Sequence, residues 1–223
     1  MDYNSFLELV KKRRSYREFN SKPVPDGSIE KIVDAARWAP SGFNSQLWEF
    51  VAIRDPSLKD EIVDIVADVM PPRPGNDSLP SKPKPGMKDP RMGFKIAPVF
   101  IIIYGDSRVR NYAPPGVDDK KWMSIFISSL AIPYQYMHMA ATSLGLASKW
   151  VSAVARPGAD EKIKNLLGVP DEFVVYDMIA IGYSDFEPPP KKMRELNEVL
   201  HYDKCSEGDF RTEEQIKESF ARK

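Results

Sequence analysis

Residues 120–146, KKWMSIFISSLAIPYQYMHMAATSLGL, decide the fold, because they predict a long helix that is apolar on almost every side. Pro133 lies inside this helix, and we expect a kink there. A helix without a polar face must be enclosed by other protein. We therefore expect neighbouring elements of this chain, or a second subunit, to cover it.

Strands are predicted on both sides of the long helix along the chain. PVFIIIYG (98–105) has the composition of a buried strand, and ASKWVSAV (147–154) predicts a second strand directly after the helix. Residues 158–168 predict a helix that Gly168 ends, and residues 172–183 predict the last strand.

The remaining elements are predicted before and after this region. They are a helix over 3–13, a helix capped by Asp26 or Ser28 and ended by Pro40, a loop over 41–46, a strand over 47–55, a helix over 56–70, and a C-terminal helix over 212–223 with a capping box at Thr212 and Gln215.

Two segments have little capacity to form a core. Residues 71–92, PPRPGNDSLPSKPKPGMKDPRM, are rich in proline and predict a long surface excursion or lid. Residues 184–223 carry only a narrow apolar stripe, so we expect an extended C-terminal arm wrapped over a neighbouring chain. We expect residues 1–223 to form one domain that carries both segments.

The composition excludes several classes of function. Basic and acidic side chains number 32 each, so the formal net charge is zero, which argues against a general nucleic-acid binder with a basic face. The single cysteine, Cys205, excludes an intrachain disulfide. Together with only two histidines, His138 and His201, it cannot form a Cys- or His-rich zinc site, and we expect no metal.

Membrane and export signals are not expected either. The longest apolar run, residues 97–105, is too short to cross a bilayer. Residues 1–15 lack the apolar core of a signal peptide, so we expect a cytoplasmic protein. Neither histidine resembles half of a nucleophile–base pair. If the protein is an enzyme, we expect a bound cofactor to supply the reactivity.

Five basic side chains cluster in KKRRSYREF, residues 11–19. Cations at the end of a helix interact favourably with its macrodipole and free carbonyls, by about 0.3–1 kcal/mol each. That interpretation explains less about Ser15 and Arg17, which lie beyond the predicted helix. A locally bound phosphate is the alternative interpretation of the cluster.

Three further segments carry candidate polar contacts. In APSGFNSQLWEF (39–50), Asn44 and Gln46 lie in a loop, where their carboxamides could donate to and accept from the edge of a heterocycle. An ordinary Ser-Gly-Asn turn is the alternative there. The other two segments are GLASKWV (145–151), which joins the long helix to a strand, and PPPKKMREL (188–196), which contributes Lys192 and Arg194.

Taken together, these segments resemble the nitroreductase family of FMN-dependent oxidoreductases. RRSYREF, PVP, AARWAPSGFNSQLWEFVAI, GLASKWVSAV and IGY followed by PPPKKMREL occur in the family's order and spacing, over about residues 5–202. The resemblance implies an α+β fold, a three-layer α-β-α sandwich whose mostly antiparallel or mixed central sheet is flanked by helices. It also implies an intertwined homodimer with exchanged C-terminal arms.

The resemblance also assigns residues to FMN. Arg13, Arg14, Ser15 and Arg17 would hold the ribityl phosphate and the pyrimidine edge, while Lys192 and Arg194 would reach the phosphate. Pro40, Ser41, Asn44 and Gln46 match a loop that meets the flavin across the subunit boundary. Trp150, Val151, Ser152 and Ala153 match the segment beside the reactive N5, although some relatives carry an acidic residue and glycine where this chain has Ser152 and Ala153.

The reaction implied by the resemblance passes hydride from NADH or NADPH through flavin N5 to an electron-poor acceptor, a nitroaromatic or quinone. The order is ping-pong, and no side-chain nucleophile is required. Three alternatives stay open. They are an FMN-dependent reductive dehalogenase or substrate dehydrogenase of the same fold, a flavin-binding or redox-sensing protein without turnover, and a nucleic-acid or anion binder that uses residues 11–17.

Overall fold

The computed structural model describes residues 2–70 and 92–221. The predicted lid over 71–92 therefore lies outside the described residues, apart from its last residue, Met92. The chain divides into two compact units, Met1–Pro188 and Pro189–Lys223. The first unit contains the sheet and most of the predicted site residues, and each unit is described by itself.

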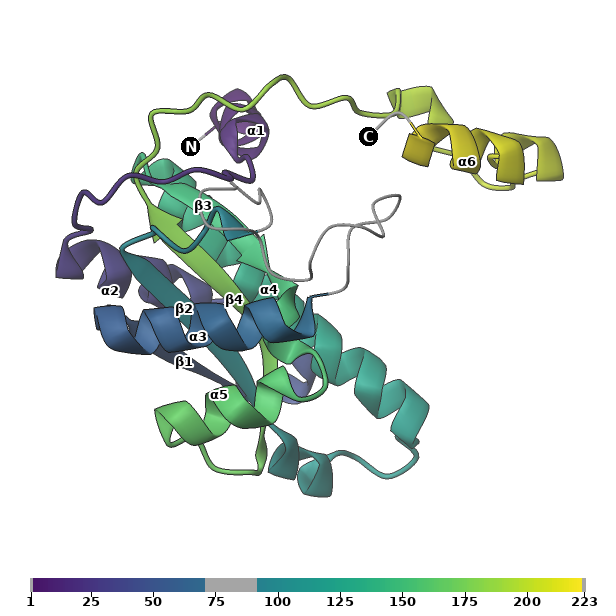
Figure 1. Ribbon diagram of the computed structural model, residues 1–223. Coiled ribbons are helices and arrows are strands. Elements are labelled where there is room, and N and C mark those ends of the chain that lie inside the picture. The colour runs from purple at the N-terminus through teal and green to yellow at the C-terminus, as the bar shows by residue number, and fades with distance from the viewer. Residues whose placement is uncertain (1, 71–91, 222–223) are drawn as a thin grey trace. The chain divides into compact units, whose positions relative to one another are not determined.

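Four antiparallel strands form one open sheet in the order β1-β2-β4-β3 (Figure 1). The strands are β1 (Trp48–Ile53), β2 (Val99–Asp106), β3 (Ala147–Val151) and β4 (Phe173–Gly182). The two central strands, β2 and β4, are mostly buried on both faces. This burial explains the continuous apolar run that predicted β2.

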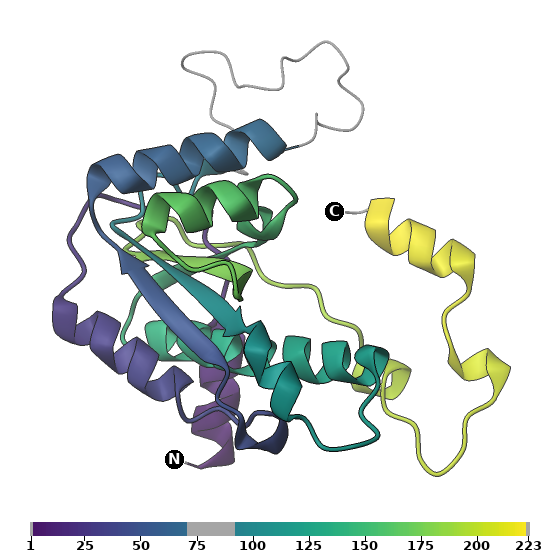
Figure 2. The ribbon, with the colours of Figure 1, turned by 90° about the horizontal axis from the view of Figure 1, so that it is seen from below.

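Helices cover both faces of the sheet and make three layers, which Figure 2 shows from below. On one face α2 (Asp26–Ala36) packs against α4 (Asp119–Ser143), and on the other α3 (Pro56–Val69) packs against α5 (Ala159–Leu167). The side chains of β2 alternate between the two cores, as a pleated strand requires. The predicted α+β sandwich with an antiparallel sheet is confirmed.

The long helix α4 continues through Pro133 without a break. Its N-terminus is capped by Asp118, whose carboxylate accepts the N–H of Lys121 at 2.7 Å. One side of α4 packs against the sheet, whereas Met123 and Ile127 on its outer side remain about half exposed. Among the described residues, no helix combines the length and apolarity that a membrane crossing needs.

The predicted and observed ends of three elements can be compared. The capping box of α6 (Glu213–Ala221) is confirmed, because Thr212 and Gln215 exchange hydrogen bonds. The cap of α2 is Pro25 rather than Asp26 or Ser28, since Asp26 already lies in the helix and its carboxylate pairs with Arg54. The strand predicted over 147–154 ends at Val151, where the chain enters a 3-10 turn.

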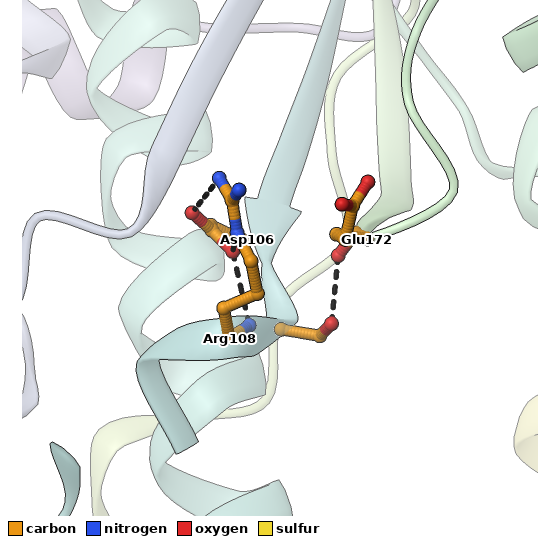
Figure 3. Close-up of polar contacts among 4 residues, drawn as sticks. Asp106, Arg108 and Glu172 are labelled. Carbon is orange, nitrogen blue, oxygen red and sulfur yellow. Dashed lines mark hydrogen bonds and ion pairs between the residues drawn. The ribbon is translucent and has the colours of Figure 1, made fainter. Parts of the chain in front are cut away.

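Polar contacts fix the end of β2 against the start of β4 (Figure 3). The carboxylate of Asp106 accepts hydrogen bonds from Arg108 Nε at 2.9 Å and from Arg108 Nη2 at 2.8 Å. Ser107 Oγ donates to the carbonyl of Glu172 at 2.7 Å. The charge of Arg108 is therefore paired with the carboxylate of Asp106.

Candidate functional site

The basic N-terminal segment runs beside strand β3. Helix α1 (Tyr3–Lys12) ends before Arg13, so only Lys11 and Lys12 lie in its last turn. Beyond the helix, Ser15 bridges Ser148 at the start of β3, and the N–H of Tyr16 donates to the carbonyl of Ser148 at 3.0 Å. The macrodipole therefore does not account for Ser15 and Tyr16, because they lie beyond the C-cap residue Arg13 and are held against the sheet.

Arg13 is a half-buried cation without a partner among the described residues. Its side chain makes no hydrogen bond or ion pair there, and burial, followed by the charge of Arg14, lowers its pKa. Arg14 itself donates to the carbonyl of Pro188 at 3.5 Å. Because an uncompensated charge is costly to desolvate, this position favours a bound anion.

A buried histidine supports the strand to which the basic segment is attached. His138 Nδ1 lies 2.8 Å from Ser148 Oγ, and the ring stacks on Trp150. Its Nε2 is buried without a hydrogen-bond partner in the described part of the chain. Burial, followed by the charge of Arg13, lowers the pKa of His138 to about 3, so the imidazole is neutral at physiological pH.

A pocket of about 340 Å³ lies beside the C-terminal end of β3. It brings Arg17 together with the predicted segment Trp150, Val151, Ser152 and Ala153. Its volume lies at the lower end of the range for small-molecule sites. Three other residues also line it, namely Met70, Lys149 and Arg156, and no motif in the sequence indicated them.

Trp150 joins this pocket to a buried carboxyl group. Its indole Nε1–H donates to Asp177 Oδ2 at 2.7 Å, and its ring contacts Tyr134, with the ring centroids 4.6 Å apart. Burial raises the pKa of Asp177 to about 7, although the hydrogen bond from Trp150 acts in the opposite direction. Trp150 is still 46% exposed, so it is only partly a core residue.

The predicted loop over residues 41–46 has an unusual backbone. Phe43, Asn44 and Gln46 have positive φ angles of 58°, 51° and 45°, and such conformations outside glycine concentrate at functional sites. Ser41 Oγ accepts the N–H of Gln46 at 3.0 Å, which helps to hold this shape. The carboxamides of Asn44 and Gln46 are exposed, as are the side chains of Pro40 and Phe43.

This loop is not part of the pocket that contains Arg17. Its Gly42 N–H donates to Ser129 Oγ on α4 at 3.0 Å. Ser129 and His138 are nine residues apart on the same helix, or about 13 Å along its axis. One chain thus brings together the basic segment and β3, but it places residues 40–46 elsewhere.

The two remaining predicted residues, Lys192 and Arg194, belong to the second unit. Both are exposed, and Arg194 donates to the carbonyl of Glu198 within that unit. Over residues 2–70 and 92–221, no three side chains of the His, Cys, Asp and Glu types are grouped as metal ligands.

Known proteins resemble this chain over most of its length. The model of the nitroreductase family matches residues 10–183. An iodotyrosine deiodinase from Nematostella vectensis is 29% identical over 209 residues, which cover 87% of this chain and 74% of the relative. A NADH dehydrogenase from Thermus thermophilus is 26% identical over 201 residues, which cover 85% of this chain and 91% of the relative.

A solved structure is also similar. It is an FMN-dependent nitroreductase from Clostridium difficile, which is 25% identical and superposes with a TM-score of 0.66. The match covers 89% of this chain and 99% of the other. The helices and strands that surround the candidate pocket therefore follow a known arrangement.

Proposed function

This chain belongs to the nitroreductase family, and on that premise we propose that it takes hydride from NADH or NADPH and delivers it to an electron-poor nitroaromatic or quinone acceptor. It is an FMN-dependent oxidoreductase, in line with the names of its relatives. When bound, FMN would supply the redox chemistry as the carrier of hydride between the donor and the acceptor. The protein contributes binding, orientation and electrostatics.

The observation that carries this proposal is the unpaired, half-buried charge of Arg13. A flavin phosphate is a dianion, and charge-assisted hydrogen bonds contribute about 1.5–3 kcal/mol each. Arg14 and the hydroxyl of Ser15 lie in the same segment, so they can share the phosphate. Lys192 and Arg194 of the second unit are the further cations that we assign to it.

The ring of FMN would occupy the pocket beside β3. Arg17 would face the pyrimidine edge, where a positive charge stabilises the reduced, anionic flavin. Ser152 and Ala153 begin a 3-10 turn, so the turn itself does not use their backbone N–H groups. These N–H groups can donate a hydrogen bond to flavin N5, even though this chain has Ser152 and Ala153 where some relatives carry an acidic residue and glycine.

The two substrates would use this pocket in turn, which is a ping-pong order. No side chain is required as a nucleophile, and His138 is neutral, buried and held by Ser148. Arg17 and the segment from Trp150 to Ala153 would orient the nicotinamide first and the acceptor afterwards. Protons can come from solvent.

We also propose that two chains form the intertwined homodimer that the family resemblance implies. On α4, Met123, Ile127 and Tyr136 expose apolar surface, which a second copy would cover. The loop with Asn44 and Gln46 would then reach the flavin of the partner. The second unit also exposes many apolar side chains, among them Met193, Leu196, Val199 and Tyr202, as an exchanged arm would before it docks.

The decisive experiment is an absorption spectrum of the purified protein before and after anaerobic addition of NADH or NADPH. We expect a yellow protein that either nucleotide bleaches and that a nitroarene or quinone recolours. A yellow protein that is not bleached would instead favour a flavin-binding or redox-sensing role. A colourless protein that binds polyanions would favour an anion binder.

A second candidate reaction is reductive dehalogenation, which the similarity to an iodotyrosine deiodinase favours. Oxidation of a substrate by the same flavin is related chemistry. Parallel assays with a nitroarene, a quinone and a halotyrosine distinguish these reactions. Turnover confined to the halotyrosine would replace the proposed acceptor.

A further inference from the structure

We propose that Arg156 binds the oxyanion of an anionic acceptor, so that the enzyme prefers electron-poor aromatic acids to neutral acceptors of the same shape. The inference rests on the proposed function, because the acceptor must share the pocket with the flavin. It concerns a residue outside the segments that resemble the family's cofactor contacts. It therefore names a class of substrate that those contacts leave open.

The backbone of Arg156 is held firmly at the rim of the pocket. Its N–H donates to the carbonyl of Ala153 at 3.3 Å, and its own carbonyl accepts from Ala159 at 2.9 Å and from Asp160 at 3.2 Å. Pro157 follows and favours the extended conformation that Arg156 adopts, with φ −74° and ψ 147°. The Cα of Arg156, from which the side chain extends, is therefore held beside Ala153.

The charge of Arg156 is not neutralised within the described part of the chain. The side chain is exposed and makes no ion pair or hydrogen bond there. The carboxylate of Asp160, close in sequence, accepts the N–H of Gly158 at 3.1 Å. Arg108, by contrast, donates two hydrogen bonds to the carboxylate of Asp106 (Figure 3).

The other two cations of the pocket have different contacts. The ammonium group of Lys149 lies 5.2 Å from the centroid of the Phe94 ring, and Arg17 is assigned above to the pyrimidine edge of the flavin. The described residues that line the pocket include no carboxylate. Arg156 therefore remains for a second anion, and its planar guanidinium matches a carboxylate in two parallel hydrogen bonds.

The rest of the lining suits an aromatic ligand. Met70 and Trp150 contribute apolar surface to the same pocket, and thioether and indole groups make favourable contacts with aromatic rings. A flat ring with one carboxylate would thus contact both kinds of surface. A nitrobenzoate has this combination and is also electron-poor.

The test compares 4-nitrobenzoate with 4-nitrobenzamide, which has a similar shape but no charge, on the FMN-loaded protein. We expect a higher kcat/KM for the acid. Arg156→Ala should lower the acid-to-amide ratio about tenfold, and Arg156→Lys should lower it less. Lys162→Ala is the matched control, because it removes one exposed charge on α5 outside the pocket and should leave the ratio unchanged.

Binding gives a readout that does not depend on turnover. The oxidised flavin spectrum should change when 4-nitrobenzoate is added, and the Kd from that titration should rise about tenfold in Arg156→Ala. Equal ratios in wild type and Arg156→Ala would overturn the inference. The inference would also be overturned if Arg156→Ala impaired only the anaerobic bleaching by NADPH and not that by NADH. Arg156 would then recognise the 2′-phosphate of the donor.

The experiment separates this inference from the proposed function. A protein that NADH and NADPH both bleach, but that treats the acid and the amide alike, contradicts only the role of Arg156. A flavin-loaded protein that neither nucleotide bleaches contradicts the proposed function and this inference together.

Discussion

The indole N–H of Trp150 donates to the carboxylate of Asp177 at 2.7 Å across the β3–β4 pair. Trp150 is opposite Ile179 in the register, two residues from Asp177, so the two side chains are diagonal neighbours on one face. Only 6% of the surface of Asp177 is exposed. The pair therefore places an ionisable carboxyl group directly behind a residue of the pocket.

Asp177→Asn should stabilise the protein relative to wild type at pH 8, and this gain should almost disappear at pH 4. The folded pKa of Asp177 is about 7, above its unfolded value of 3.8, so its contribution to stability is lost as pH rises from about 4 to 7. Asn removes this penalty and can still accept the indole N–H. Urea titrations should show a gain of about 1–3 kcal/mol at pH 8 and little difference at pH 4.

A difference between Asp177→Asn and wild type that does not vary with pH would contradict this expectation. Asp34→Asn is a suitable control, because Asp34 is exposed on α2 and pairs with Arg37. Its replacement should change stability little at either pH, as is usual for exposed ion pairs.

His138→Asn should change the pH dependence of stability in the opposite direction. The pKa of His138 falls from 6.5 to about 3 on folding, so its contribution is present above pH 6.5 and lost as pH falls toward 3. In wild type this loss overlaps with the gain from Asp177 between about pH 4 and 6.5, and the two offset each other. The variant should therefore become more stable as pH falls from 7 to 4.

The measurement is the free energy of unfolding of flavin-free protein at several pH values. The absolute stability of His138→Asn should also drop, because the ring contacts with Tyr134 and Trp150 are lost. The slope, rather than this drop, is the critical result. A slope like that of wild type would show that His138 is already protonated or is not buried in solution.

Arg13→Ala combined with Arg17→Ala should release FMN at micromolar protein. Two charge-assisted contacts contribute about 3–6 kcal/mol together. The measurement is the flavin-to-protein ratio after dialysis. Lys11→Ala with Lys12→Ala is the matched control, because it removes the same charge from the last turn of α1. If both pairs retain equal flavin, the phosphate lies elsewhere.

The sequence predicted those parts of the fold whose signals are local. The apolar run of β2, the helix periodicity of α3 and α5 and the capping box at Thr212 all depend on neighbouring residues, and the structure contains them. The predicted end of the strand at residue 154 was wrong, because β3 ends at Val151 and Ala153 and Val154 are buried in a 3-10 turn. The sequence could not show this, since an apolar pattern of this length fits a strand equally well.

The missed parts of the site depend on contacts between distant segments. Tyr16 meets Ser148, and Trp150 meets Asp177, through pairings that no local pattern encodes. Arg156 could have been noticed only as a cation before a proline, which is a common arrangement. The positive φ of Phe43 had no sequence signal either, since a bulky residue rarely adopts it.

Gly42→Ala should destabilise the loop that carries Asn44 and Gln46. An added Cβ would overlap Ile125 Cγ2 on α4, and overpacking of this kind costs about 1–3 kcal/mol. Gly27→Ala is the control, because the described residues outside its own helical turn place no atom within 4 Å of the added Cβ, and alanine favours the helix. Thermal unfolding should show a lower Tm for the first variant only. Equal Tm values would show that the loop does not pack on α4 in solution.

Ile127→Glu should separate the proposed dimer into monomers. Ile127 is 48% exposed on the outer side of α4, where a buried carboxylate at a subunit interface would lack a partner. Val174→Glu is the control, since Val174 is a similarly exposed apolar residue on β4. Light scattering during size-exclusion chromatography gives the mass of each variant. Because the loop of residues 40–46 would reach the flavin of the partner chain, the monomer should also lose FMN. A variant that stays dimeric would place the interface elsewhere, and a monomer that keeps its flavin would show that one chain suffices to bind it.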